Sequence, residues 1–242
     1  MAPVPVSYAI VLLVLGALVL IHELGHFVAA LLCRLPVRRF SVGFGPALVA
    51  LRRRGVEYRL SLFPLGGYVL PGGSRPDRFF DEAASKRLLF CMGGPAANLV
   101  VAFVLLAVFN VATGSLSWQA VWTLPLAQLA AALKATFRAL ASLAAGGGEI
   151  SGVVGVLTEG SSFVGTSLVA ALQFAIVMSV NLAVLNSLPL PPLDGGKALL
   201  CLAELLGGRV RRLQVPVNVA GLAVLLAAIG YAVFVDLGRL LS

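Results

Sequence analysis

Charged residues are scarce in this sequence: Asp, Glu, Lys and Arg together make up 12% of its 242 residues, against about 25% in an ordinary soluble domain. Apolar residues make up 60%. A membrane-spanning helix needs about 20 mostly apolar residues, and four segments qualify, at roughly 8–32, 95–113, 168–188 and 216–235. The composition therefore argues against a soluble protein and predicts an all-α polytopic membrane protein with about four transmembrane helices.

Basic residues are missing from the first 33 positions, since the first one is Arg34. The first apolar run therefore lacks the cationic segment of a signal peptide, and we expect it to be retained. The net charge is +8, but fifteen of the 18 basic residues lie between the first and second or the third and fourth spans. The positive-inside rule places those connections in the cytoplasm. We expect no nucleic-acid partner, and a multi-pass protein of the cell (inner) membrane with both termini extracytoplasmic.

Cysteine is also rare. Cys33, Cys91 and Cys201 are isolated, odd in number and without C-x-x-C spacing. Neither a disulfide framework nor a cysteine zinc site is indicated, and we expect reduced cysteines that pack among apolar side chains.

The sequence has only two histidines, and both lie in the first apolar run, where His22, Glu23 and His26 are the only residues of charged or imidazole type. A charge near the bilayer centre costs at least ~2.5–3.5 kcal/mol. Residues four apart share a helix face, so both imidazoles can bind one zinc ion. Glu23 then lies beside the metal as a general base, which is the H-E-x-x-H arrangement of a metalloprotease. The alternative is a pair of histidines that merely pack against a neighbouring helix.

A third metal ligand is needed, because a catalytic zinc usually takes three from the protein. With no third histidine, the ligand must be a carboxylate or a thiolate. Asp194 is the best candidate, because it follows three prolines in residues 189–192 and a broken helix can line a cavity. Glu204 and Asp236 lack such a break. The alternative role for Asp194 is to cap a helix at about 197–206.

The first cytoplasmic connection contains a predicted small, membrane-associated β-hairpin. Residues 56–63 alternate partly between polar and apolar, as in a half-buried strand, and residues 65–69 provide a turn and a return strand. A protease must hold its substrate extended, and an open strand edge can pair with an extended peptide. The alternative is a hairpin that dips into the membrane without touching a substrate.

The connection at about 114–167 contains a predicted extracytoplasmic amphipathic helix at roughly 125–145. Gln128 and Lys134 lie off its apolar face. The helix either covers the outward mouth of the cavity or packs as an ordinary structural helix. The residues of the apolar face are Leu126, Leu129, Leu133, Phe137 and Leu140.

Five short motifs occur in order along the chain: H-E-L-G-H at 22–26, F-S-V-G-F-G at 40–45, P-L-G-G-Y-V at 64–69, G-G-P-A-A-N at 93–98, and N-S-L-P-L-P-P-L-D-G at 186–195. Together they resemble the motifs of the site-2 protease family of intramembrane zinc metalloproteases, in particular its RseP-like branch. The chain departs from that branch in two respects. The 114–167 connection is too short for its PDZ domains, and residues 151–155 read S-G-V-V-G where relatives often read S-G-P.

The resemblance implies specific roles. Asp194 corresponds to the third zinc ligand. Gly66, Gly67 and Tyr68 belong to the hairpin that is thought to hold the substrate. Asn186 corresponds to a contact with the substrate or the oxyanion, for which a helix-packing amide is the alternative.

We therefore predict a single intramembrane zinc metalloendopeptidase domain over residues 1–242. By resemblance, its partners besides the lipid bilayer are single-span membrane proteins, either anti-sigma factors or remnant signal peptides. Two other classes remain open: a membrane metal-ion transporter and a catalytically inactive membrane chaperone.

Overall fold

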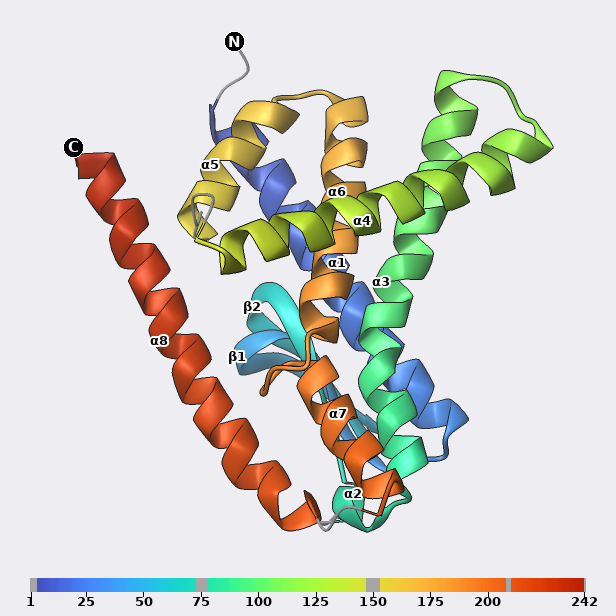
Figure 1. The fold of residues 1–242 in the computed structure, drawn as a ribbon, viewed down its shortest axis with the longest axis vertical. Coiled ribbons are helices and arrows are strands. Elements are labelled where there is room, and N and C mark those ends of the chain that lie inside the picture. The colour runs from blue at the N-terminus through green and yellow to red at the C-terminus, as the bar shows by residue number, and fades with distance from the viewer. Residues whose placement is uncertain (1–3, 73–77, 147–152, 208–209, 242) are drawn as a thin grey trace. The chain divides into compact units, whose positions relative to one another are not determined.

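The computed structural model describes residues 4–72, 78–146, 153–207 and 210–241, which are mostly helical (Figure 1). Its elements, in chain order, are α1 (Val4–Leu32), β1 (Val37–Arg53), β2 (Val56–Pro71), α2 (Arg78–Asp81), α3 (Ala84–Thr113), a π-helical turn η1 (Gln119–Thr123), α4 (Leu124–Ala144), α5 (Val153–Val164), α6 (Leu168–Ser187), α7 (Asp194–Leu205), a short helical turn η2 (Val210–Leu213) and α8 (Gln214–Leu241).

Within the described ranges, five helices are long and apolar enough to cross a membrane. The sequence pattern predicts four, and that count is not confirmed. The additional candidate is Gln119–Leu143, which comprises η1 and most of α4; its mean hydropathy of 1.2 compares with 1.9–2.3 for the others. The chain is a multi-pass membrane protein, and α4 is the helix whose relation to the membrane decides the number of spans.

The second span, expected at 95–113, is part of a longer helix. α3 begins at Ala84 and continues through Pro95. Proline lacks an N–H group, so the carbonyl of Cys91 loses its usual helical donor. The helix nevertheless extends on both sides, because residues such as Ala, Leu, Lys and Met before the proline favour helix. The helix therefore extends beyond the span expected at 95–113, which stays a prediction.

Two compact units share these helices. The first comprises Met1–Val14, Leu99–Val184 and Ala223–Ser242, and the second comprises Leu15–Asn98 and Leu185–Leu222. The chain passes between the units inside α1, α3, α6 and α8. The single domain expected over 1–242 stays a prediction.

In the first unit, α4 crosses α6 at a steep angle (Figure 1). Thr136 on α4 donates a 2.9 Å hydrogen bond to the side-chain oxygen of Asn181 on α6. Such bonds fasten helices that apolar contacts alone would leave free to slide. Apolar residues of α4, at 129, 132, 133 and 140, pack against Ala102 of α3 and against Val180 and Val184 of α6.

The packed face of α4 differs from the expected one. Leu126 and Phe137, expected in the face, are 57% and 54% exposed. Gln128, expected outside it, exchanges two hydrogen bonds with Asn110 of α3, at 2.9 and 3.2 Å. Polar side chains between apolar helices satisfy one another, so polarity alone does not identify the face that packs.

In the second unit, α1 and α3 approach closely where both carry glycine. A Cβ on Gly93 would lie 2.6 Å from the carbonyl oxygen of Gly25, and a Cβ on Gly25 would overlap the carbonyl of Gly93. Close backbone approach through small residues is typical of packed membrane helices. The core beside this crossing contains Ala30, Leu35, Val37, Phe90, Cys91 and Ala198.

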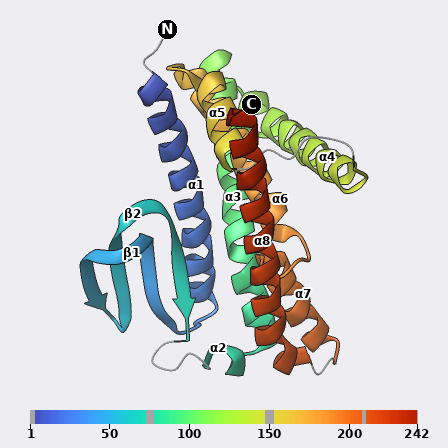
Figure 2. The same cartoon turned by 90° about the vertical axis from the view of Figure 1, so that its left-hand side faces the viewer.

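The sheet also belongs to the second unit, and it lies beside the C-terminal half of α1 (Figure 2). β1 and β2 join at Arg54 and Gly55, whose φ angles of 49° and 82° suit a tight hairpin turn. The expected pairing of 56–63 with 65–69 is wrong, because both segments belong to the continuous strand β2. Each segment pairs with β1 instead.

The two ends of β1 have different partners in β2. Residues 47–53 pair with 56–61 next to the turn, whereas residues 37–42 pair with 67–71. Residues 39–42 are also paired on their other side, with 57–60. The run 67–71 therefore forms an edge of the sheet.

Candidate metal centre

His22 and His26 lie one helical turn apart on one face of α1, in the second unit. Their ring centroids are 4.8 Å apart, and their Nε2 atoms are 3.2 Å apart. Both residues are buried, with 6% and 5% exposure. The i, i+4 spacing thus brings the two imidazoles together, as the helical period predicts.

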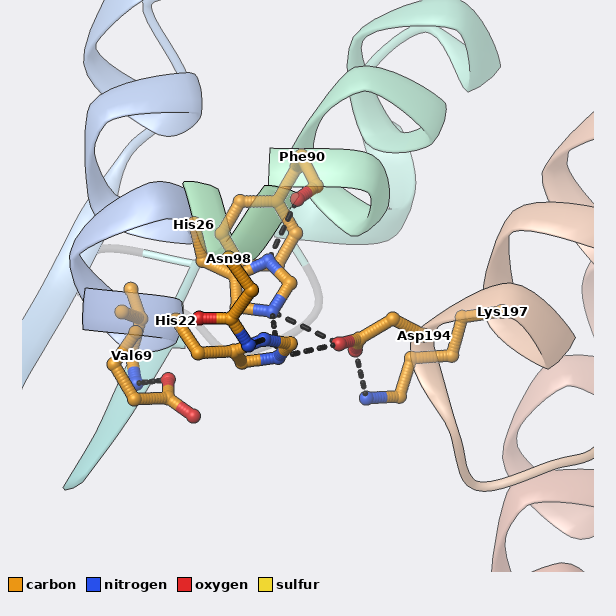
Figure 3. Close-up of polar contacts among 8 residues, drawn as sticks. His22, His26, Val69, Phe90, Asn98, Asp194 and Lys197 are labelled. Atoms are coloured by element: carbon orange, nitrogen blue, oxygen red, sulfur yellow. Dashed lines mark hydrogen bonds and ion pairs between the residues drawn. The ribbon is translucent and has the colours of Figure 1, made fainter. Parts of the chain in front are cut away.

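Asp194 is the first residue of α7. Its Oδ2 lies 3.0 Å from Nε2 of His22 and 3.0 Å from Nε2 of His26 (Figure 3). The N-cap of α7 is Leu193, and no side-chain hydrogen bond caps the helix, so the carboxylate is not used as a cap. Burial acts to raise the pKa of Asp194, but its contacts with the two histidines outweigh burial and hold the pKa below its ordinary range.

These three donor atoms fit a zinc ion. Two imidazole nitrogens and one carboxylate oxygen lie 3.0–3.2 Å from one another. Tetrahedral zinc with bonds of about 2.0–2.1 Å keeps its ligand atoms roughly 3.3 Å apart. Three such ligands leave one position for water or substrate, as in catalytic zinc sites. Among the described residues, His22, His26 and Asp194 form a group whose ligand atoms lie close enough to one another to hold one metal ion.

Gly94 on α3 leaves room beside the two histidines. A Cβ at this position would lie 2.5 Å from Nε2 of His22 and 2.5 Å from Nε2 of His26. The lack of a side chain therefore keeps open the space next to both donor nitrogens. This cradle, which a single methyl group would fill, is a second observation that suits an ion at this place.

The far nitrogen of each imidazole is also held. Nδ1 of His26 donates a 2.7 Å hydrogen bond to the carbonyl of Phe90 (Figure 3). The side-chain amide of Asn98 lies 3.2 Å from Nδ1 of His22. A proton on Nδ1 leaves the lone pair on Nε2, and such outer contacts fix the orientation of a ligating histidine. The contact with Phe90 thereby sets His26 to present Nε2, whereas the ring of His22 is held by the Asn98 amide, whose Nδ2 is the atom beside Nδ1.

Lys197 holds the other oxygen of Asp194. Its Nζ donates to Oδ1 at 3.1 Å from one turn further along α7. One carboxylate oxygen therefore faces the imidazoles while the other faces an ammonium group. The Lys197 side chain is 44% exposed and that of Asp194 is 11% exposed, so the pair joins the buried group to a more open surface.

Glu23 lies next to this group and outside the triangle of donor atoms. Its Oε2 accepts a 3.1 Å hydrogen bond from the N–H of Val69. Val69 belongs to the sheet edge 67–71. The carboxylate is therefore held by the strand edge and is free of the contacts that join His22, His26 and Asp194.

The residues expected to bind substrate fall in two places. Gly67 is buried, and a Cβ there would lie 3.6 Å from Cγ of Glu23. Its neighbour Gly66 is also buried, with φ of +110°, a value that favours glycine. Tyr68 accepts a 3.3 Å hydrogen bond from Arg39. Asn186 lies half-buried in the last turn of α6, and its role, like that of the hairpin residues, stays a prediction.

Three features of the site are absent from the sequence-based prediction: Gly94, Lys197 and the carbonyl of Phe90. Gly94 lies in the G-G-P motif, and its position before Pro95 was the available signal. Lys197 is three residues from Asp194, a spacing that brings side chains together on a helix. A backbone carbonyl has no sequence signal at all.

Comparison with known proteins gives consistent results. The family model described as Peptidase family M50 matches residues 10–228. A protein of Chlamydia trachomatis named "Putative zinc metalloprotease" is 37% identical over 126 residues, which cover 45% of this chain and 20% of that protein. One of the same name in Treponema pallidum is 41% identical over 113 residues, covering 40% and 25%. Metalloprotease MmpA of Caulobacter vibrioides is 36% identical over 132 residues, covering 43% and 33%.

The similarity to these relatives covers part of each protein. The matched segments span between a fifth and a third of the lengths of the three relatives. The family match, in contrast, covers residues 10–228 and therefore includes all five motifs described above. These names support the sequence-based prediction of a zinc-dependent protease.

Proposed function

Because this chain belongs to peptidase family M50, we propose that it is a zinc-dependent endopeptidase that hydrolyses peptide bonds within the membrane. One observation carries the proposal. His22 and His26 present their Nε2 atoms, and Asp194 its Oδ2, to a common point. The two histidines belong to α1, an apolar helix long enough to cross a bilayer. Buried ionisable groups in such a helix mark function.

The chain's own residues supply the remaining parts of the reaction. A zinc ion held by the three ligands supplies a Lewis acid for the scissile carbonyl and lowers the pKa of a water molecule. Glu23 accepts a proton from the attacking water and returns it to the departing amine. Asn186 is proposed to donate a hydrogen bond to the oxyanion or to the substrate backbone.

Substrate positioning is assigned to the sheet edge 67–71. An extended peptide can add to an exposed edge by backbone hydrogen bonds. The contact between Val69 and Glu23 means that a peptide at this edge passes close to the general base. A Cβ on Gly67 would lie 2.5 Å from the carbonyl oxygen of Ser41, so this glycine lets the edge pair closely with β1.

Substrates and location extend the proposal. By resemblance, we propose single-span membrane proteins such as anti-sigma factors or remnant signal peptides, in the cell (inner) membrane. The basic residues favour a site near the cytoplasmic face, with both termini extracytoplasmic. The steep crossing of α4 over α6 (Figure 1) and its low mean hydropathy favour a helix that does not cross the membrane, which restores four spans.

The test is cleavage of a tagged single-span membrane protein, either coexpressed or mixed in detergent with the purified chain. We expect a shorter product with wild type and none with Glu23→Gln, while zinc content stays at about one equivalent in both. Undiminished cleavage by Glu23→Gln would exclude the mechanism. Zinc flux into liposomes without cleavage would instead support a metal-ion transporter.

A further inference from the structure

A pocket in the second unit has no role in the steps described above. Its volume is about 380 Å³. It is lined by the end of the sheet edge, by α2, by one face of α7 and by the first turns of α8. All of its lining residues belong to the second unit, so its walls are placed relative to the metal ligands.

The pocket adjoins the catalytic groups through three of its lining residues. Val69 donates its N–H to Glu23, Phe90 accepts a hydrogen bond from His26, and Lys197 donates to Asp194. Each of these three residues also lines the pocket. The pocket therefore adjoins Glu23, His26 and Asp194 through these three residues.

Its walls are mainly apolar. Phe79 of α2 packs edge-on against Phe90 and against Phe80, with centroid distances of 5.3 and 5.7 Å. Two polar residues in the lining are already engaged: Gln214 with Arg87 and Glu204, and Lys197 with Asp194. The third, Asn218, donates to the carbonyl of Gln214, and its buried Oδ1 has no hydrogen-bond partner among the described residues. A ligand of this pocket therefore gains mostly from burying apolar surface, and the ammonium of Lys197 repels a cation.

We propose that this pocket is a substrate subsite that takes one large apolar side chain, of the size of leucine or phenylalanine. The proposal rests on the protease function above. A pocket of this volume lies at the lower end of the range for small-molecule sites, about 300–1,000 Å³, so it has room for a whole large side chain but not for a helix.

The register of a bound peptide limits which residue enters. A peptide paired with the edge 67–71 advances about 3.3 Å per residue. Val69 both contacts Glu23 and lines the pocket, and Leu70 and Pro71 continue its wall. The side chain that enters therefore belongs to a residue within about two positions of the scissile bond. Lysine or arginine at that position is excluded by Lys197.

The experiment uses a single-span substrate whose cleavage site is first mapped by mass spectrometry with the wild-type enzyme. Each of the three positions on either side is then changed to Ala, Leu, Phe and Lys. We expect one position at which Leu and Phe are cleaved at least about tenfold faster than Ala, and at which Lys is cleaved slowest. The remaining positions should show a weaker dependence.

Variants of neighbouring residues on α7 provide the matched comparison. Leu200 lines the pocket, whereas Leu199 is 48% exposed and does not line it. Leu200→Trp fills the pocket, so it should raise KM for the Leu and Phe substrates and reverse the preference toward Ala. Leu199→Trp should keep the wild-type preference, and both variants should keep about one zinc.

The outcomes are distinguishable. Cleavage that depends on Glu23 but is indifferent to residue size at all six positions would overturn the pocket alone, and this result needs no pocket variant. An equal loss on every substrate in Leu200→Trp would assign Leu200 a structural role and contradict the proposal. Absence of any Glu23-dependent cleavage by wild type would overturn the proposed function and the subsite with it.

Discussion

Gly94 is the residue on which space for the metal depends. A side chain there would sit 2.5 Å from both donor nitrogens, closer than non-bonded atoms approach. The substitution Gly94→Ala should therefore displace one imidazole and disrupt the site, although alanine favours a helix more than glycine does. Elemental analysis should show zinc well below the roughly one equivalent expected for wild type.

A glycine in open surroundings serves as the control for that variant. Gly230 in α8 has nothing within 4 Å of a Cβ position, so Gly230→Ala should retain its zinc. Full zinc occupancy in Gly94→Ala would mean that the metal does not lie beside both Nε2 atoms.

Asn98 is predicted to set the orientation of His22. When Nε2 of His22 binds a metal, Nδ1 carries a proton, and the Asn98 amide, whose Nδ2 lies 3.2 Å away, accepts that proton when it turns to present Oδ1. Loss of such an outer contact typically lowers metal affinity about 10- to 100-fold. Asn98→Leu should show this loss in a titration with a chelator, whereas Asn98→Asp, which keeps an acceptor oxygen, should lose less.

Val100 is the matched control, because it lies two residues along the same helix and is 62% exposed. Val100→Ala should bind zinc like wild type. If Asn98→Leu also bound zinc with unchanged affinity, the asparagine would be a packing residue between helices and no more.

The candidate site was predictable as far as residue type and spacing carry information. Two histidines and a glutamate in an apolar run carry a free-energy cost of membrane insertion that indicates a function, and a helix brings residues four apart together. Asp194 was identifiable because a proline-rich break precedes it. Gly94 was not, because its role depends on which helix lies against the histidines. That neighbour is a tertiary property.

At the scale of elements, a buried arginine joins α3, α7 and α8. Arg87 is fully buried; it donates to Glu204 of α7 at 2.7 Å and to Gln214 of α8 at 2.9 Å. It also donates to the backbone carbonyl of Glu82 at 3.1 Å. Since α7 carries Asp194 at its start, this network fixes the helix that supplies the carboxylate to the metal centre.

Removal of Arg87 should destabilise the fold. Breaking a buried ion pair by deleting one partner costs about 3–5 kcal/mol, and because Glu204 is 25% exposed we expect the lower end, about 3 kcal/mol. Arg87→Met should lower the midpoint of thermal unfolding in detergent by several degrees. The adjacent pair Lys86–Glu82 is more exposed, so Lys86→Met should change the midpoint of unfolding little. Equal midpoints for the two variants would show that the buried network contributes no more to stability than the exposed ion pair does.

The elements themselves were predictable more readily than their partners. The long apolar runs correctly indicate α1, α3, α6 and α8, because hydrophobic length is a local property. The apolar run does not show that α3 begins at Ala84, eleven residues before the expected span, because the residues before Pro95 include Ser, Lys and Arg. The pairing of 37–42 with 67–71 joins segments that a propensity argument cannot connect. The packed face of α4 includes the half-buried, polar Gln128, so a polarity pattern does not identify it.

At the scale of the whole molecule, the metal centre constrains the number of spans. His26 lies near the end of α1, and Asp194 follows the end of α6 by seven residues. Because these residues meet, α1 and α6 must end on the same side of the membrane. That requires an even number of crossings between them, namely α3 and α6 without α4.

Single-cysteine labelling tests this count, after Cys33, Cys91 and Cys201 are changed to serine. Leu116→Cys precedes α4 and Ala145→Cys follows it, at positions that are both exposed. If α4 does not cross the membrane, a membrane-impermeant maleimide should label both in intact cells. Arg53→Cys and Leu206→Cys, which lie in the basic connections, should be labelled only after permeabilisation.

Labelling of 116 but not of 145 would make α4 a fifth span. Asp194 would then emerge on the side opposite His26, which the geometry of the metal centre forbids. Labelling of position 53 in intact cells would reverse the orientation and place the site near the outer face.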